Sequence, residues 1–196
     1  MKSIITDMPR YKRYIQGEGT LDIGFPWLTL GAILALEQTI LQPTFNVLEL
    51  GSGGSTIFWA RRVALVVSIE TEEKWANAVR AKLATLSDVC PVTIYVKPYR
   101  EAAAWIETAF SDNSYDLLLI DHANQRRSSK GWRYRTDRNL MGWPAMKKVK
   151  PGGWCVVDNY MMHRMEETDW TGWDVYHHDA LHYNGRGTLI AQKNVS

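Results

Sequence analysis

The residues best suited to chemistry form a glycine-rich turn, Gly51-Ser52-Gly53-Gly54, directly after the apolar run Phe45–Leu50. Glycine lets the backbone turn sharply and lets a ligand lie directly on the main chain. About 20 residues further on, the next apolar run ends at Glu70, whose carboxylate can accept two hydrogen bonds from ribose hydroxyls. This pair predicts a site for a nucleoside-containing ligand at the carboxyl ends of parallel strands.

A glycine turn with a downstream acid is also typical of enzymes that bind dinucleotides. Two details argue against a dinucleotide in this chain. Thr56 stands where that pattern needs its third glycine, and an acidic residue, Glu49, stands just before the turn. An NAD(P)-dependent oxidoreductase is thus the weaker alternative, because the third glycine of the dinucleotide pattern is missing.

The segment Val47-Leu48-Glu49-Leu50-Gly51-Ser52-Gly53-Gly54-Ser55-Thr56 resembles the first motif of the class I methyltransferases that depend on S-adenosylmethionine. Glu70-Thr71-Glu72-Glu73-Lys74-Trp75 is similar to the acidic end of the second strand in that family. The resemblance implies that the main chain at 51–53 meets the methionine part of this cofactor and that Glu70 meets the ribose. S-adenosylmethionine has no pyrophosphate for a glycine turn to bind. It has a cationic sulfonium, for which a nearby carboxylate such as Glu49 is useful. The candidate cofactor-binding residues are Glu49, Gly51, Ser52, Gly53, Gly54, Ser55, Thr56, Glu70, Thr71, Asp121 and His122.

Polar residues also follow the fourth and fifth apolar runs of the chain. Asp121 and His122 come after 115–120, and Asp158 and Asn159 come after 153–157. Because the ends of adjacent parallel strands open toward one cleft, Asp121, Asp158 and Asn159 could form an oxygen-rich site for a hard cation such as Mg²⁺. Such an ion would lower the pKa of an acceptor hydroxyl.

This set is similar to that of the catechol-type, metal-dependent O-methyltransferases, which also place a histidine beside the first aspartate, as His122 does here. The lysine that would serve as the base in those enzymes is Asn124 in this chain. Two interpretations stay open: Asp121, Asp158 and Asn159 hold Mg²⁺, or they are polar strand ends that hold the cofactor and loops. The missing lysine and a different glycine placement in the first motif favour the second.

Methyl transfer to a hydroxyl is a displacement on carbon, so a base beside the acceptor is useful. The candidate catalytic residues are Asp121, His122 and His163. No Asn-Pro-Pro-Tyr motif follows the fourth run, which disfavours methylation of amino groups on nucleic-acid bases. The sequence therefore predicts O-methylation of a small-molecule or saccharide acceptor. A non-catalytic S-adenosylmethionine-binding module that recognises an anionic partner remains an alternative.

These residues need an α/β frame to bring them together. Continuous apolar runs alternate with helical patterns, which is typical of a parallel sheet covered on both faces. We expect a single-domain, Rossmann-like methyltransferase fold with a mostly parallel seven-stranded sheet, a C-terminal antiparallel hairpin and helices on both faces. The predicted helices are 26–41, 55–62, 72–86, 101–110 and 139–149, and the predicted strands are 45–50, 64–69, 92–96, 115–120, 153–157, 173–178 and 188–192.

Composition places the chain among globular proteins, with 45% hydrophobic and 22% charged residues. Residues 1–24 are predicted to form an N-terminal flap or short helix, and residues 25–196 the methyltransferase domain. No apolar run approaches the roughly 20 residues of a membrane helix, and the N-terminus does not resemble a signal peptide. Two cysteines in apolar, strand-like surroundings suggest buried thiols, so a cytoplasmic location is expected and no zinc site.

The net charge is +2, but its distribution is uneven. Nine basic residues and one acidic residue lie between His122 and Lys150. This segment indicates either an anionic acceptor or a solvated loop and helix face. No nucleic-acid partner and no membrane partner are expected, and the oligomeric state is not predicted. The nine residues are Arg126, Arg127, Lys130, Arg133, Arg135, Arg138, Lys147, Lys148 and Lys150.

Overall fold

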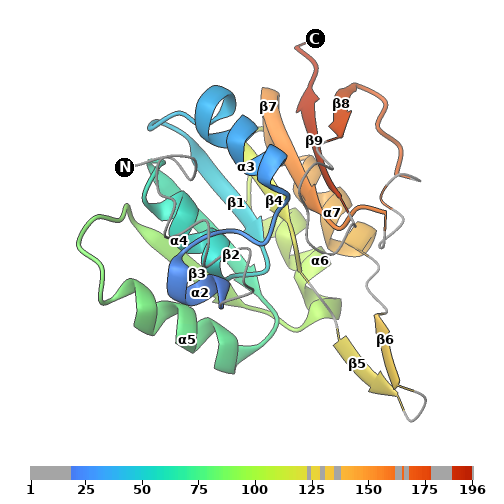
Figure 1. Ribbon diagram of the computed structural model, residues 1–196. Helices are drawn as coiled ribbons and strands as arrows, with labels where there is room; N and C mark the ends of the chain where they lie inside the picture. The colour runs from blue at the N-terminus through green and yellow to red at the C-terminus, as the bar shows by residue number, and fades with distance from the viewer. Residues whose placement is uncertain are drawn as a thin grey trace.

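A seven-stranded sheet forms the centre of the computed structural model, shown in Figure 1. The structure describes residues 19–122, 125–128, 131–134, 138–161, 165, 168–177 and 187–195, and in 125–128 and 131–134 the backbone alone. The first five strands in spatial order are parallel, and the sixth runs antiparallel to both of its neighbours. In that order the strands are β3 (Val92–Val96), β2 (Leu65–Glu70), β1 (Asn46–Leu50), β4 (Tyr115–Ile120), β7 (Val149–Asp158), β9 (Thr188–Lys193) and β8 (Trp173–His177).

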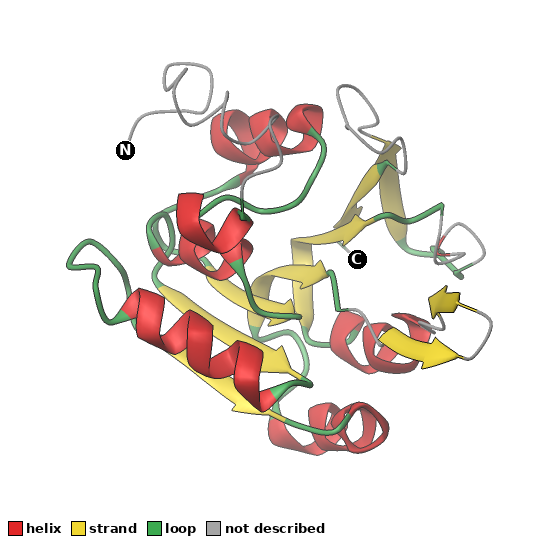
Figure 2. Cartoon of the chain, turned by 60° about the horizontal axis from the view of Figure 1, so that its bottom comes forward, coloured by secondary structure: helices red, strands yellow, loops and turns green. Residues whose placement is uncertain are grey.

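Helices cover both faces of the sheet (Figure 2). One face carries α2 (Thr20–Ile23), α3 (Leu30–Ala35), the π-helix η1 (Leu36–Ile40), α4 (Gly54–Ala60) and α5 (Glu73–Leu83). The other face carries α6 (Tyr99–Ala109) and α7 (Arg138–Met146). None of the described helices is long and apolar enough to cross a membrane.

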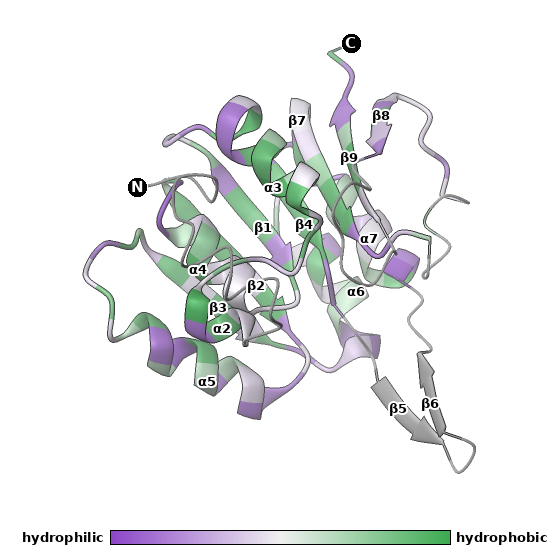
Figure 3. Ribbon diagram, viewed as in Figure 1, coloured by the Kyte–Doolittle hydropathy of each residue, from purple (hydrophilic) through white to green (hydrophobic). Residues whose placement is uncertain are grey.

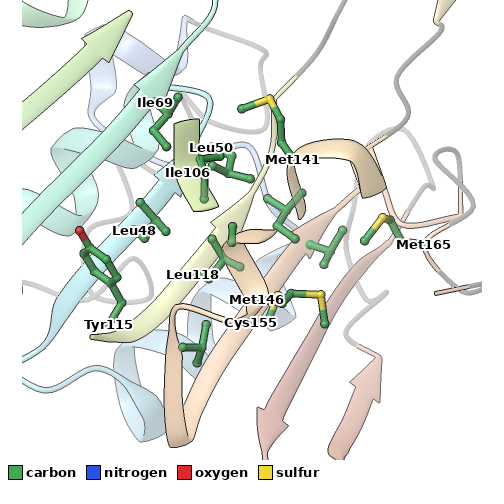
Figure 4. Close-up of a cluster of buried hydrophobic side chains, with 14 of the residues drawn as sticks. Leu48, Leu50, Ile69, Ile106, Tyr115, Leu118, Met141, Met146, Cys155 and Met165 are labelled. Atoms are coloured by element: carbon green, nitrogen blue, oxygen red, sulfur yellow. The ribbon is translucent and has the colours of Figure 1, made fainter. Parts of the chain in front are cut away.

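Strand residues alternate between the two cores that these helices form. Val47 packs with Phe58 and the other residues under α4, whereas its neighbour Leu48 packs with Ile106 and the residues under α6 and α7 (Figure 4). In Figure 3 the strands of the sheet are mostly hydrophobic, whereas α5 carries hydrophilic residues as well. Burial on both faces explains why these strands read as continuous apolar runs. The predicted fold class is confirmed.

Three local predictions need correction. The helix expected over 26–41 starts only at Leu30, where the Thr29 side chain accepts from the Ala32 N–H, and it continues as a π-helix. β7 begins at Val149, four residues before the expected start, because Val149 already pairs with Tyr115 of β4. The register shifts after this pair, and Gly152 in the irregular segment has φ 77°. The basic stretch contains an unforeseen antiparallel pair, β5 (Gln125–Ser128) and β6 (Gly131–Tyr134).

The N-terminal boundary stays a prediction. The helix α2 lies within the expected flap of residues 1–24, and residues 1–18 lie outside the described part of the chain. His163 and Asn124 also lie outside the described residues, so their predicted roles stay predictions.

Candidate functional site

The glycine turn connects β1 to α4 and lies against the end of β4 (Figure 1). Gly51 adopts φ 95°, and a Cβ there would come within 2.9 Å of the His122 backbone. At Gly54 a Cβ would come within 2.2 Å of the Phe25 carbonyl oxygen. At Gly53 it would meet only the Trp75 ring, at 3.8 Å, an ordinary contact. Packing therefore requires glycine at positions 51 and 54, and the structure leaves Gly53 as the tolerant position.

Glu49 is fully buried beneath this turn and does not belong to the described wall of the pocket. Its carboxylate accepts hydrogen bonds from Thr56 Oγ1 at 2.6 Å, Ser68 Oγ at 2.7 Å and Trp59 Nε1 at 3.2 Å. Burial raises the pKa of Glu49 to about 7, although hydrogen bonds from Ser55, Thr56 and Ser68 oppose the rise. The Glu49 carboxylate thus supports the turn from below, and its contact with a cofactor stays a prediction. The predicted residues Ser55 and Thr56 are likewise buried, on α4.

Glu70, at the end of β2, is held by donors from the glycine turn and from the start of the next loop. Its Oε2 accepts from the backbone N–H of Ser52 at 2.9 Å and from the Ser52 hydroxyl at 3.0 Å. Its Oε1 accepts from the backbone N–H groups of Thr71 at 2.6 Å and Glu72 at 3.0 Å. These bonds fix the carboxylate at the edge of the pocket, beside the turn.

A pocket of about 250 Å³ opens at the carboxyl ends of β1, β2 and β4. This is the edge at which open parallel sheets bind their ligands. Three carboxyl groups stand in its wall, and no lysine or arginine is among the described residues that line it. The electrostatics of this wall favour a cationic ligand over a pyrophosphate. The lining residues are Gly51, Ser52, Glu70, Glu72, Trp75, Asp121 and His122.

Two of these residues, Glu72 and Trp75, were not singled out from the sequence as pocket residues. The Trp75 indole N–H donates to the Ser52 carbonyl at 2.6 Å, so α5 is tied to the glycine turn. Trp75 is 40% exposed, which is unusual for a ring this large and leaves part of it open toward the pocket. The available signal was its position five residues after Glu70, at the first turn of the helix that follows β2.

Asp121 also lines the pocket, beside Gly51, and forms an ion pair with Arg138 at the start of α7. Arg138 Nη2 donates to Asp121 Oδ1 at 3.1 Å, and Arg138 Nη1 donates to the carbonyl oxygens of Ile120, at 3.0 Å, and Asp158. The Arg138 side chain is only 2% exposed. Burial raises the pKa of Asp121, and the guanidinium of Arg138 opposes this effect.

Asp158 is the last residue of β7, and Asn159 follows it. The Asp158 carboxylate is held by hydrogen bonds from neighbouring side chains. The Asp158 carboxylate accepts from Asn159 Nδ2 and from Thr188 Oγ1, and the Thr188 hydroxyl in turn accepts from the Thr29 N–H. Burial, followed by the nearby charge of Asp121, raises the pKa of Asp158 well above its ordinary value. Asn159 adopts φ 50°, a left-handed conformation that asparagine tolerates better than most residues.

Arg138 binds two members of the predicted Mg²⁺ set, Asp121 and Asp158. The structure brings Asp121 and Asp158 to neighbouring strand ends, but the guanidinium of Arg138 lies between these strand ends. Within the described part of the chain, no group of three or more His, Cys, Asp and Glu side chains could hold a metal ion. The donors present therefore do not fit the metal that the resemblance to catechol-type enzymes implied.

His122 is buried in the pocket wall, and its ring lies 5.6 Å from the Tyr99 ring at an angle of 39°. Of the predicted catalytic residues, Asp121 and His122 thus share one pocket. Gly51, Ser52 and Glu70, from the predicted cofactor set, also lie in its wall.

The basic segment is less available to a partner than its sequence suggested. Four of its nine basic residues are paired with acidic residues of the same chain: Arg138 with Asp121, Lys147 with Glu107, Lys148 with Asp112 and Lys150 with Asp116. Lys148 is almost fully buried. The side chains of the other five lie outside the described residues.

No protein-family model matches the chain, and no curated protein matches its sequence. Its fold, in contrast, matches solved structures. The O-methyltransferase from Bacillus cereus in complex with SAH has a TM-score of 0.61 and 20% identity, with 95% of this chain and 91% of that chain covered. The O-methyltransferase TomG from Streptomyces achromogenes, in complex with SAM, has a TM-score of 0.61 and 18% identity, with 85% and 78% covered.

Methyltransferases with a different acceptor also match. An rRNA methylase from Streptococcus thermophilus has a TM-score of 0.55 and 10% identity, with 80% of this chain and 90% of that chain covered. At such identities a likeness shows the architecture and leaves the reaction to be argued from the site. The chain has the fold of the S-adenosylmethionine-dependent methyltransferases.

Proposed function

We propose that this protein is an S-adenosylmethionine-dependent methyltransferase that methylates an oxygen atom of a small-molecule or saccharide acceptor. The observation that carries the proposal is the acidic pocket between the glycine turn and the ends of β2 and β4, with Glu70, Glu72 and Asp121 in its wall. A sulfonium is cationic, and the carboxylates of Glu70 and Glu72 favour it, whereas Arg138 offsets the charge of Asp121. The two phosphates of a dinucleotide would meet the same groups at an electrostatic cost, which argues against the oxidoreductase alternative.

In this proposal the glycine turn and Glu70 hold the cofactor. The main chain at Gly51 and Ser52 lies against its methionine part, and Glu70 accepts hydrogen bonds from its ribose hydroxyls. Glu70 is suited to this role because the donors of Ser52, Thr71 and Glu72 already fix its orientation. Preorganisation of this kind lowers the entropic cost of binding.

Asp121 and His122 stand on the acceptor side of the proposed cofactor site. During transfer the acceptor oxygen forms a bond to the methyl carbon, the carbon–sulfur bond breaks, and its electron pair goes to sulfur. The hydroxyl proton passes to a base, and the described candidates are the Asp121 carboxylate and the His122 imidazole. His163 stays a further candidate from the sequence. An acceptor held close to these groups reacts faster, because its orientation toward the methyl group is fixed.

A turnover assay tests whether the protein transfers a methyl group to an acceptor oxygen. The protein is incubated with S-adenosylmethionine carrying a labelled methyl group and with pools of phenols, sugars and phosphorylated sugars. We expect S-adenosylhomocysteine to form with at least one pool, and the Asp121→Asn or His122→Gln variant to lose roughly 100-fold or more of that rate. Tight cofactor binding without turnover in any pool would favour the non-catalytic module. S-adenosylhomocysteine formation only in a parallel pool of amines would contradict O-methylation.

A further inference from the structure

Arg138 occupies an unusual place for a residue in a basic segment. Its guanidinium binds three acceptors from the ends of two adjacent strands: the Ile120 carbonyl and the Asp121 carboxylate at the end of β4, and the Asp158 carbonyl at the end of β7. The side chain is almost completely buried. A guanidinium keeps its charge at every accessible pH, and its planar fork can bridge several oxygens in fixed geometry.

We propose that Arg138 is a positioning residue that supplies the fixed positive charge of this site in place of a divalent cation, so that the chain carries out its chemistry without a bound metal. The role of Arg138 in catalysis rests on the proposed methyltransferase function, whereas the replacement of the metal does not. Asp121 is the group that Arg138 positions, since Asp121 is the partner of Arg138 that lines the pocket.

Protein donors already bind one carboxylate oxygen of Asp121, the Asp158 carbonyl and both carboxylate oxygens of Asp158. Mg²⁺ demands near-octahedral coordination by oxygen at close distances. Asp121 Oδ1 and the Asp158 carbonyl each accept from Arg138, and the Asp158 carboxylate accepts from Asn159 and Thr188. A cation at this place would have to displace a buried guanidinium of like charge. The charge of Arg138 therefore opposes the binding of a divalent cation between these strand ends.

The same contacts fix the Asp121 side chain relative to the cofactor pocket. The Asp121 backbone N–H donates to the Leu50 carbonyl at the end of β1, at 3.0 Å, and its carboxylate is held by Arg138. Main chain and side chain are thus anchored from two directions.

Binding of Mn²⁺ to the wild-type protein tests the absence of a metal site without any cofactor or acceptor. The loss of the free-ion electron paramagnetic resonance signal is followed as protein is added to micromolar Mn²⁺. We expect the signal to stay undiminished and to be the same for Asp121→Asn. Stoichiometric Mn²⁺ binding that Asp121→Asn abolishes would overturn the proposal, even if the protein never transfers a methyl group.

The positioning role is tested by S-adenosylmethionine affinity in Arg138→Ala, with and without added methylguanidinium. We expect an affinity loss of about tenfold or more, as for other charge-assisted contacts, with partial recovery when methylguanidinium is present. Lys148→Met is the matched control, because Lys148 is also a buried cation bound to a carbonyl and a carboxylate, but outside the pocket wall. Lys148→Met should lose stability and keep its cofactor affinity.

Unchanged cofactor affinity in a folded Arg138→Ala variant would overturn the positioning role. So would an equal affinity loss in Lys148→Met, because it would mark a general effect of stability. If wild type binds neither S-adenosylmethionine nor Mn²⁺, the proposed function fails while the absence of a metal site stands. If wild type binds the cofactor and also binds Mn²⁺ through Asp121, the proposed function stands and this inference fails.

Discussion

The Thr56 hydroxyl donates to the Glu49 carboxylate at 2.6 Å and at the same time accepts from the backbone N–H of Gly53 at 2.8 Å. The glycine turn is therefore connected by one hydroxyl to a fully buried carboxyl group. Glu49 acts beneath the turn, as part of the support that holds its backbone in place. Support of this kind matters because a binding backbone must keep its geometry to within a fraction of an ångström.

The raised pKa of Glu49 predicts a specific pH dependence of stability. Since the folded-state pKa is about 7 and the ordinary value is 4.5, the folded state binds more protons between these values. The free energy of unfolding should therefore fall as pH rises through this window, by an amount on the order of 3 kcal/mol from this group. Glu49→Gln, uncharged at every pH, should remove this part of the slope in urea unfolding between about pH 5 and about pH 8.

Glu73→Gln is the control for this measurement, because Glu73 is an exposed carboxylate on α5. It should keep the slope of the wild type. An equally steep slope in Glu49→Gln would show that Glu49 is ionised in the folded protein throughout this range, and the account of its burial would then be wrong.

Gly51→Ala should destabilise the protein and abolish cofactor binding. The substitution combines a left-handed φ of 95° with a Cβ only 2.9 Å from the His122 backbone. Gly172→Ala is a matched control, because Gly172 has φ 83° and open space around it. We expect roughly 1–2 kcal/mol of lost unfolding free energy for the strain alone, and roughly 1–3 kcal/mol more at Gly51 for the clash.

Chemical denaturation and calorimetric titration check this pair of variants together. Only Gly51→Ala should lose cofactor affinity. Equal losses of stability in the two variants would mean that the approach of the turn to β4 imposes no steric requirement at Gly51.

Trp75→Phe should weaken cofactor binding by roughly threefold to tenfold, since it keeps an aromatic ring but removes the donor to the Ser52 carbonyl. The wild-type fluorescence should change on cofactor binding, and most of that change should vanish in Trp75→Phe. Trp143→Phe serves as control, because Trp143 is an exposed tryptophan of α7 outside the pocket wall. A fluorescence response that persists in Trp75→Phe and vanishes in Trp143→Phe would contradict the assigned pocket.

The sheet and the glycine turn could be predicted because their signals are local. Apolar runs such as 115–120 mark buried strands, and Gly51 follows such a run directly. The end of β2 at Glu70 could be predicted in the same way. These features need no knowledge of which strands become neighbours.

Arg138 could not be assigned from the sequence, because its burial depends on the topology. β4 and β7 are far apart in the chain, and only their pairing brings Ile120, Asp121 and Asp158 within reach of one guanidinium. In the sequence Arg138 is one more basic residue in a basic segment. The role of Trp75 was hidden for the same reason, since its contact with Ser52 depends on how α5 packs against the turn.

Irregular backbone accounts for most of the remaining differences. The Pro151-Gly152-Gly153 segment has the composition of a turn, yet it continues β7 as an irregular part of the strand. The arginine-rich hairpin of β5 and β6 lacks the alternation of apolar and polar residues that would identify strands, and its register places Arg126 opposite Arg133.

Calorimetric titration with S-adenosylmethionine tests the central claim most directly, using wild type, Glu70→Gln and Glu73→Gln. The account predicts saturable one-to-one binding by wild type, competition by S-adenosylhomocysteine, and no binding of NADH. Glu70→Gln should bind roughly tenfold to a hundredfold more weakly, the usual loss for a hydrogen bond to a charged group, and Glu73→Gln should match wild type. No saturable binding by wild type, or equal affinity in Glu70→Gln, would contradict it.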